Sequence, residues 1–402
     1  MSLKILTFSS LFPNNMAPHH GIFVRERMVH AAVQNEWKVT VVAPIPYYPP
    51  LPFGWRRKYR QVQAEENFQG LSIYHPSFFM IPKIGMVLQG ILLFVSVLPL
   101  VRRLRDAVGF DCIDAHYVYP DGLAGVLLGK TFKKPVVITV RGSDVNVFQH
   151  FSLIRRWLRY ALQQADAVIV VSQALRKAVM DLGVLPQRIH VVPNGVDGNK
   201  FVPMSRKESR EKLGLPLDEK IFLSVGNLTE NKGMDLLVRA FHAMRDRMQF
   251  SRSRLLIIGE GPQQARLIKL IDSLSLKNDV SLVGKVPHSE LFLWYASADV
   301  FCLMSQREGW PNVLLEAMAC GIPVLATRAG GIPEIVRSNE LGMLVDREVK
   351  AIAEGMRTAF QTHWNSQVIR TYAESHSWRE VSIRLKDIFD SVTHGAMYAQ
   401  KA

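Results

Sequence analysis

Residues 300–321 read VFCLMSQREGWPNVLLEAMACG, in which a short apolar run is followed by a broken segment and a second apolar run. The first run, Val300–Leu303, predicts a buried strand. Gly309 and Pro311 interrupt the chain after it; Pro311 suits the first position of a helix and Gly321 suits its end. The stretch therefore predicts a strand, a tight connection and a helix from about Asn312 to Cys320.

A helix that begins next to a strand end has first-turn amides without intrahelical partners, and such a terminus is a natural site for a diphosphate. Glu308 lies just before the predicted terminus, and Glu316 lies one turn inside it. Their spacing lets one carboxylate meet a sugar while the other meets the ribose hydroxyls of the same molecule. For two glutamates alone, a surface acid and an acid that solvates the helix would be the better interpretation, and it is the surrounding residues that favour a ligand site.

The rest of the chain repeats the alternation of apolar strand and helix. The predicted strands are 4–9, 38–43, 71–75, 112–115, 136–140, 167–171 and 189–192, then 221–225, 254–258, 280–283, 300–303, 324–326 and 343–345. Helical patterns at 22–34, 153–164 and 234–247 lie between them. Continuous apolar strands separated by helices indicate parallel sheets covered on both faces, so the fold class is α/β with two doubly wound, Rossmann-like domains.

The turn-rich segment 193–197 marks the predicted domain boundary. We expect an N-terminal domain at 1–197 and a C-terminal domain at 198–376, with the helical segment 377–402 crossing back to the first. A length of 402 residues fits two such domains. Ligands of these sheets bind beyond the carboxyl ends of the strands, so we expect the two domains to face a central cleft that holds the chemistry.

Charge is unevenly distributed along the chain. Residues 1–200 carry 23 Lys and Arg against 12 Asp and Glu, whereas the remainder carries 26 against 23. The basic half suggests an anionic partner, and the alternative is a generally basic soluble enzyme. Nucleic acid is disfavoured, because basic and aromatic residues are not interleaved and no recognition helix is evident. The three cysteines, Cys112, Cys302 and Cys320, have no metal-ligand spacing and predict reduced, buried thiols.

Residues 84–101 are mostly apolar and are followed at once by Arg102, Arg103 and Arg105. Eighteen residues reach only the lower limit for a membrane span, and a span here would separate strands of one sheet. The segment therefore predicts either a buried core helix or a helix on a membrane surface, with the arginines at the lipid headgroups.

Several motifs resemble the large retaining glycosyltransferase family usually numbered four, whose fold is called GT-B. The matching segments are 191–197 (VVPNGVD), 224–228 (SVGNL), 231–233 (NKG), 283–291 (VGKVPHSEL), 295–299, 308–324 (EGWPNVLLEAMACGIPV) and 330–334 (GGIPE). The resemblance covers nearly the whole chain, is most specific from residue 190 to 336 and is thin across 45–105. It implies a hexosyltransferase of the kind that builds bacterial exopolysaccharide or teichuronic acid.

The resemblance assigns donor roles in the C-terminal domain. Lys232, with first-turn residues Val313 and Leu314, is expected at the diphosphate; Glu316 at the ribose; and Glu308 at the sugar hydroxyls. Backbone groups near Lys285 and Val286 are expected to read the nucleobase, which favours uracil. Asn227 stands where many members have an arginine, so this chain brings less charge to the diphosphate.

The same resemblance assigns residues of the N-terminal domain. Gly21 is expected near the donor phosphate or acceptor, and His20 stands where members often have a second glycine. Arg141 stands where many have a histidine; since an arginine cannot act as a base, its role with Asp144 is electrostatic catalysis, or else a buried salt bridge between the two. His116 and Asp121 are expected on the acceptor side, with core or capping roles as the alternative.

The expected activity follows from the resemblance. A hexose or hexosamine moves from a nucleotide sugar, favouring a UDP-sugar, to a lipid-linked or polysaccharide acceptor, with acceptor specificity in residues 45–105. No metal or other cofactor is expected, because no His, Cys, Asp or Glu cluster has metal spacing and no Asp-x-Asp triplet follows a strand. The protein is expected in the cytoplasm, peripherally on the anionic inner face of the membrane. The departures at Asn227, Arg141 and His20 leave open an inactive sugar-binding or scaffold subunit.

Overall fold

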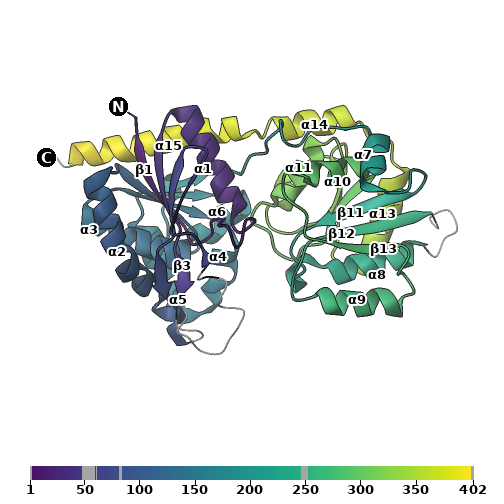
Figure 1. Cartoon of the computed structure of the whole chain (residues 1–402), viewed down its shortest axis with the longest axis horizontal. Coiled ribbons are helices and arrows are strands. Elements are labelled where there is room, and N and C mark those ends of the chain that lie inside the picture. The colour runs from purple at the N-terminus through teal and green to yellow at the C-terminus, as the bar shows by residue number, and fades with distance from the viewer. Residues whose placement is uncertain (1, 48–58, 60, 81–83, 246–251, 400–402) are drawn as a thin grey trace. The chain divides into compact units, whose positions relative to one another are not determined.

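The computed structural model describes residues 2–47, 59, 61–80, 84–245 and 252–399. The chain forms two compact units (Figure 1): unit 1 is Met1–Asn194 with Trp378–Ala402, and unit 2 is Gly195–Ser377. Residues 246–247 of one predicted helix, 400–402 of the C-terminal segment, and 48–58, 60 and 81–83 of the expected acceptor-specificity region lie outside the described residues.

Unit 1 is built on an eight-stranded sheet in the order β10-β9-β8-β7-β1-β2-β5-β4. Its strands are β1 (Lys4–Phe8), β2 (Lys38–Val42), β4 (Glu65–Phe68), β5 (Leu71–Tyr74), β7 (Cys112–His116), β8 (Val136–Val140), β9 (Ala167–Val170) and β10 (Ile189–Val191). All pairs are parallel except β4 with β5. A separate parallel pair joins β3 (Ile45–Tyr47) to β6 (Ser77–Phe79).

Helical segments surround this sheet. They are α1 (Ile22–Asn35), η2 (Ile84–Val87), α2 (Gln89–Ala107), η3 (Val118–Gly122), α3 (Leu123–Phe132), α4 (Ser143–Asn146), η4 (Phe148–His150), α5 (Ser152–Gln164), α6 (Gln173–Met180), η5 (Pro186–Arg188) and α15 (Trp378–Ala399). Every residue of β7 and β8 is buried, as expected for parallel strands with helices on both faces.

The C-terminal helix α15 packs along α1 in unit 1 (Figure 1). Its apolar face, which includes Trp378 and Phe389, joins the hydrophobic core on one side of the sheet. The ring of Trp378 stacks on His30 at 5.9 Å, and the ring of Phe389 lies 5.3 Å from Trp37. The core of unit 1 therefore depends on a segment that follows unit 2 in the sequence.

Unit 2 has a fully parallel six-stranded sheet in the order β13-β12-β11-β14-β15-β16. Its strands are β11 (Lys220–Val225), β12 (Ser253–Ile258), β13 (Val280–Gly284), β14 (Val300–Leu303), β15 (Val324–Thr327) and β16 (Gly342–Val345). Its helical segments are α7 (Arg206–Leu213), η6 (Glu230–Lys232), α8 (Met234–Arg245), α9 (Gln264–Ser273), α10 (Leu291–Ser297), α11 (Asn312–Ala319), α12 (Ile332–Ile335), α13 (Val349–Gln361) and α14 (Ser366–Glu374).

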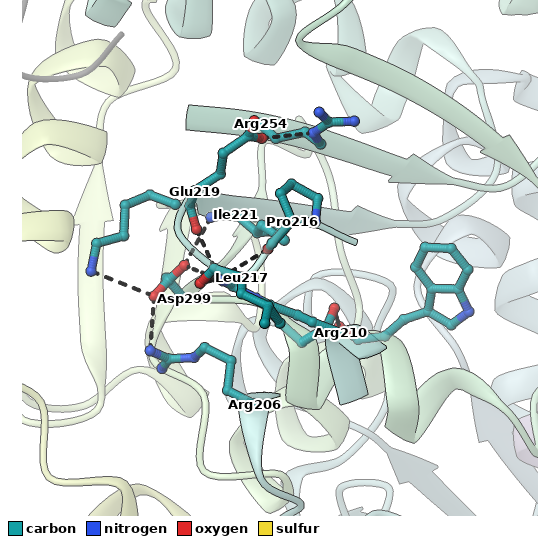
Figure 2. A network of polar contacts seen from close by, with 11 residues as sticks. Arg206, Arg210, Pro216, Leu217, Glu219, Ile221, Arg254 and Asp299 are labelled. Carbon is teal, nitrogen blue, oxygen red and sulfur yellow. Dashed lines mark hydrogen bonds and ion pairs between the residues drawn. The ribbon is translucent and has the colours of Figure 1, made fainter. Parts of the chain in front are cut away.

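A buried arginine ties the first helix of unit 2 to its sheet (Figure 2). Arg210 of α7 is 3% exposed, and its Nη2 donates to Oδ2 of Asp299 at 2.8 Å. The remaining guanidinium hydrogen bonds go to the backbone carbonyls of Ser297, Pro216, Leu217 and Glu219. Asp299 also accepts from the backbone amide of Ile221 at 2.8 Å. Arg206, also on α7, pairs with Asp299 at 2.9 Å, so two ion pairs join α7 to the starts of β11 and β14.

These sheets confirm the predicted α/β class with parallel strands. The predicted strands all form, with ends shifted by one residue at most, whereas the short strands β3, β4 and β6 were not predicted. The three cysteines are buried and free, as predicted. Residues 84–101 do not form one helix; a short turn, η2, precedes α2, which continues through the arginines to Ala107.

Helix α2 buries one face only. Leu93, Val97 and Val101 are 0% exposed, while Val95 on the other face is 60% exposed. None of the helices in the described part of the chain combines the length and the apolar character needed to cross a membrane.

Candidate functional site

In unit 2, candidate donor residues lie in the loops that follow β11, β13 and β14. These loops leave the carboxyl edge of the sheet, where ligands of parallel α/β sheets bind. Lys232 follows β11 and Glu308 follows β14, yet Lys232 Nζ lies 2.5 Å from Glu308 Oε1. Their side chains are 21% and 12% exposed. The structure thus brings together the residues expected at the diphosphate and at the sugar, in an ion pair that the sequence did not reveal.

Two neighbouring loops hold the Glu308 backbone in place. Gly330 has a φ of +52°, and a Cβ there would lie 1.8 Å from the carbonyl oxygen of Glu308. Gly331 donates its amide to that same carbonyl at 3.2 Å. On the β11 side, the side-chain amide of Asn231 donates to the carbonyl of Arg307 at 3.0 Å. Only glycine at position 330 allows this approach, so the Gly330-Gly331 motif fixes where Glu308 stands.

Glu316 lies inside α11 and is 7% exposed. Its Oε2 accepts from the Tyr295 hydroxyl at 2.8 Å, and its Oε1 lies 3.1 Å from Nε2 of His288. A carboxylate only accepts, so His288 carries a proton on Nε2. Burial, and then the nearby Glu316 carboxylate, raise the pKa of Tyr295, which is therefore a neutral donor. Glu316 is a buried, oriented carboxylate, and the alternative of an acid that merely solvates the helix is wrong.

The glycine-rich exit of β12 has a packing explanation. A Cβ at Gly259 would lie 2.0 Å from the carbonyl oxygen of Gly226, and one at Gly261 would lie 2.5 Å from that of Leu228. The loops after β11 and β12 therefore touch through their backbones. Asn227, exposed between these contacts, stands in the same loop as Lys232.

The remaining donor candidates occupy different environments. Lys285 is exposed and Val286 is half-buried in the loop after β13. Val313 is half-buried in the first turn of α11, whose start has no side-chain cap. Leu314 is fully buried, and its amide donates to the carbonyl of Pro311 at 3.1 Å. Leu314 is therefore a core residue, and the expectation that it contacts a diphosphate has no support in its geometry.

In unit 1, three loops at the carboxyl edge of the sheet are bonded to one another by buried carboxylates. Asp121 accepts from the amide and the hydroxyl of Ser10 at 2.6 and 2.8 Å. Burial raises the pKa of Asp121 to about 7. Asp144 accepts from the backbone amides of Gly142, Val118 and Arg141 at 2.7, 3.0 and 3.1 Å. Asp121 and Asp144 are both 0% exposed, so each holds loops together rather than facing solvent.

The guanidinium of Arg141 donates to two other side chains, and only its backbone amide donates to Asp144. Its Nη1 lies 2.7 Å from Oδ1 of Asn194, and its Nη2 lies 2.7 Å from Nδ1 of His116. The alternative of a side-chain salt bridge with Asp144 is therefore wrong, because that carboxylate is occupied by backbone amides. The other ring nitrogen of His116, Nε2, lies 2.8 Å from Oδ2 of Asp114.

His116 is 0% exposed with both ring nitrogens bonded, so it has no group left for an acceptor, and its predicted acceptor-side contact is replaced by a core role. Gly21 caps the start of α1 with a φ of +65°, and a Cβ there would lie 2.2 Å from the carbonyl of Leu11. Gly21 therefore has a backbone reason to be glycine. His20 beside it is exposed.

The stability of the protein should depend on the neutral state of His116. Burial, opposed by Asp114 and assisted by Arg141, lowers the pKa of His116 to about 4. The pKa of His116 in the folded protein lies below the ordinary value of about 6.5. The stabilisation that the neutral ring gives the folded state is therefore complete above pH 6.5 and is lost as the pH falls toward 4. The loss approaches roughly 3 kcal/mol. Urea unfolding of the wild type and of His116→Gln between pH 7 and 4.5 measures it; identical pH dependence of the two would contradict it.

Sequence reasoning missed five side chains that complete these clusters: Arg27, Asp114, Asn194, His288 and Tyr295. His288 and Tyr295 were visible only as members of a motif, and Arg27 as a charged residue on the buried face of a helix. Within the described ranges, no group of three or more His, Cys, Asp or Glu side chains is placed to hold a metal ion.

Comparison with known proteins defines the class. Residues 26–200 match the model of Glycosyltransferase Family 4, and residues 205–376 match that of glycosyl transferases group 1. The chain is 34% identical over 325 residues to D-inositol 3-phosphate glycosyltransferase 1 of Catenulispora acidiphila, covering 73% of this chain and 75% of that one. The chain therefore belongs to the family 4 glycosyltransferases, which confirms the predicted family.

One more relative and two solved structures also match this chain over most of its length. The chain is 27% identical to a Bacillus subtilis protein assigned as a teichuronic acid biosynthesis glycosyltransferase, TuaC, over 91% of this chain and 92% of that one. Its fold matches sucrose-phosphate synthase of Thermosynechococcus elongatus with a TM-score of 0.80 at 21% identity, covering 98% and 100% of the two chains. It also matches Anabaena HepE, solved with UDP-glucose, with a TM-score of 0.71 at 19% identity, covering 97% and 100%. The predicted GT-B fold with two Rossmann-like domains is confirmed.

Proposed function

We propose that this protein is a retaining hexosyltransferase that moves a hexose or hexosamine from a UDP-sugar to a lipid-linked or polysaccharide acceptor in cell-surface glycan synthesis. The observation that carries the proposal is the Lys232–Glu308 pair at the carboxyl edge of unit 2, in a chain of this family. The relative assigned to teichuronic acid synthesis supports the acceptor class, and the structural neighbour solved with UDP-glucose supports the donor.

Each part of the nucleotide-sugar donor has protein groups suited to bind it. Lys232 and the start of α11 hold the diphosphate, because a cation and backbone amides stabilise charge that develops on a leaving phosphate. Glu316, oriented by Tyr295 and His288, accepts from the ribose hydroxyls. Glu308 accepts from the sugar hydroxyls, and backbone near Val286 reads the uracil.

The reaction replaces one bond at the anomeric carbon with another on the same face. The bond from that carbon to the diphosphate oxygen breaks as a bond to the acceptor oxygen forms. The acceptor proton passes to the leaving phosphate, and UDP departs. Lys232 supplies the positive charge in this scheme, which needs no metal ion and no enzyme nucleophile.

A panel of nucleotide sugars tests the proposal through thermal stability, because a ligand that binds the folded state raises the melting temperature by mass action. UDP-sugars are expected to raise it and to support transfer to a lipid-linked acceptor. Binding without transfer from any donor and acceptor in the panel would indicate a sugar-binding or scaffold subunit. The absence of both binding and transfer would overturn the proposal.

Changing Glu308 to glutamine is expected to affect binding and turnover in opposite directions. UDP carries no sugar, so its phosphates compete with Glu308 for Lys232 and gain from loss of the carboxylate; UDP should bind about 3- to 10-fold tighter in Glu308→Gln. Transfer should slow about 10²-fold, because the sugar loses a charged acceptor. Calorimetry with UDP and initial rates measure the two effects, with Glu354→Gln on the exposed face of α13 as the control. Weaker UDP binding in Glu308→Gln would contradict the competition.

We also propose that the protein works in the cytoplasm, on the anionic inner face of the membrane, through the basic end of α2. Arg102, Arg103 and Arg105 are exposed there, and the apolar Val95 is exposed earlier on the same helix. Each arginine near an anionic surface contributes about 1 kcal/mol, so replacing all three with alanine should weaken binding to phosphatidylserine vesicles by about 10²-fold at low salt. Co-sedimentation checks this, with Arg252→Ala, also exposed, as the control. Unchanged sedimentation of the triple variant would rule out this surface.

A further inference from the structure

Arg141 is held on three sides within unit 1. Asn194 and His116 accept from its two Nη atoms, and its guanidinium lies 5.0 Å from the ring centroid of Phe23 on α1. Its side chain is 9% exposed, and its Nε has no partner among the described residues. A side chain as long as arginine keeps one direction in a binding site only if its neighbours restrict it in this way.

The contact with His116 fixes the protonation of the imidazole. An arginine donates and never accepts, so the Nδ1 that lies 2.7 Å from Nη2 must be the unprotonated ring nitrogen. The proton then lies on Nε2, which donates to Asp114 at 2.8 Å. A doubly protonated ring would place a second N–H against the guanidinium, and the bond to Arg141 would be lost.

Asp114 in turn stays ionised because cationic and donor groups surround it. Burial favours its neutral form, but His116, Arg27 and Arg141 outweigh burial and lower the pKa of Asp114. Arg27 reaches this cluster from α1, is 1% exposed, and has no hydrogen-bond partner at either Nη among the described residues. These side chains therefore form a hydrogen-bonded series, in which Asp114 orients the His116 ring and the ring orients the Arg141 guanidinium.

We propose that His116 is a positioning residue: as a neutral imidazole protonated on Nε2 and bonded to Asp114, it aims the Arg141 guanidinium for the transfer reaction. His116 acts through Arg141 and touches no substrate. The kinetic part of this inference rests on the proposed transferase function, whereas the protonation state does not.

The protonation state is tested in the full-length wild-type protein, without ligand, by NMR of selectively labelled histidine nitrogens. The signal that His116→Gln removes is expected to show one unprotonated Nδ1 and one protonated Nε2 from pH 8 down to pH 5. Of the groups that face the ring, Arg141 after β8 and Arg27 on α1 act with burial to keep it neutral, whereas Asp114 on β7 raises its pKa and is outweighed. A doubly protonated ring at pH 6, or a proton on Nδ1, would overturn the inference even if no transfer activity were found.

The positioning role is tested by a double-mutant cycle. His116→Ala should lower kcat about 10²-fold while the donor KM stays unchanged, because misplacing a catalytic group costs that much. His116→Gln should restore most of the activity, since its amide oxygen can accept from Arg141 while its amide nitrogen donates to Asp114. In the Arg141→Ala background, the added His116→Ala substitution should lower kcat only slightly further.

The outcomes separate the two proposals. A wild type that transfers from no nucleotide sugar overturns the proposed function, and the NMR result still decides the state of His116. A wild type that transfers, with His116→Ala equal to it or with additive losses in the cycle, overturns the positioning role alone. If His116→Ala does not fold, the comparison of His116→Gln with the wild type remains: a donor KM that rises with kcat unchanged would contradict the inference.

Discussion

Lys232→Ala is expected to lower kcat/KM for the donor by about 10³-fold, as loss of one preorganised charge at a developing anion does. The loss should be large because Asn227, in the same loop, brings no charge to the diphosphate. Binding of UDP should weaken along with turnover, since both depend on the same phosphate contact. Initial rates over a range of UDP-sugar concentrations, together with calorimetry of UDP, measure the two losses.

The matched control is Lys207→Ala, which removes a lysine from α7 in the same unit. Its side chain is 74% exposed in a loose pair with Glu211, and exposed pairs of this kind contribute little. Lys207→Ala should therefore transfer at the wild-type rate. A Lys232→Ala enzyme within a few-fold of the wild type would show that Lys232 does not meet the leaving group.

Asp114→Ala is expected to destabilise unit 1 by about 3–5 kcal/mol, because it leaves buried cations without their counter-charge. Arg27 and Arg141 are 1% and 9% exposed, so neither can turn to solvent without rearranging the core. The Nε2 proton of His116 would also lose its acceptor. Urea unfolding should show a lower midpoint for the transition of unit 1.

Asp106→Ala is the control for this substitution. Asp106 lies on the exposed end of α2, where it pairs with the neighbouring Arg105, and its loss should change stability by less than about 0.5 kcal/mol. Replacing Arg27 with methionine in the Asp114→Ala background should recover part of the loss, because it removes one of the two unpaired cations. If Asp114→Ala unfolds at the wild-type midpoint, the buried cluster is not held by charge.

The candidate site of unit 2 was accessible from sequence because its signals are local. Strand, break and helix follow one another between residues 300 and 321, so their order along the chain is also their arrangement in space. What the sequence did not show is that Lys232 and Glu308 are paired, since that contact joins two strand exits across the sheet. The glycines at 259 and 330 were visible, but their backbone contacts require knowledge of which loops are neighbours.

Unit 1 was harder to predict, because several of its contacts join residues that are far apart in the sequence. Arg141 and His116 were singled out separately, each with a contact that the structure replaces. Asp114 lies two residues before His116 on the same strand, but Asn194 comes from a loop far from Arg141 in the sequence, and Arg27 reaches the cluster from a helix far earlier in the chain. A buried arginine in an otherwise apolar helix face is the signal that would have revealed such a cluster.

The position of α15 against α1 also constrains the order of folding during synthesis. Domains generally fold as they leave the ribosome, beginning with the N-terminal one. Here the strands of unit 1 emerge first, yet Trp378, Leu385 and Phe389 of its core emerge only after all of unit 2. Unit 2 is continuous in sequence and can complete its core before the last helix of unit 1 is available, so the α1 surface that α15 covers should stay exposed until the α15 segment has left the ribosome.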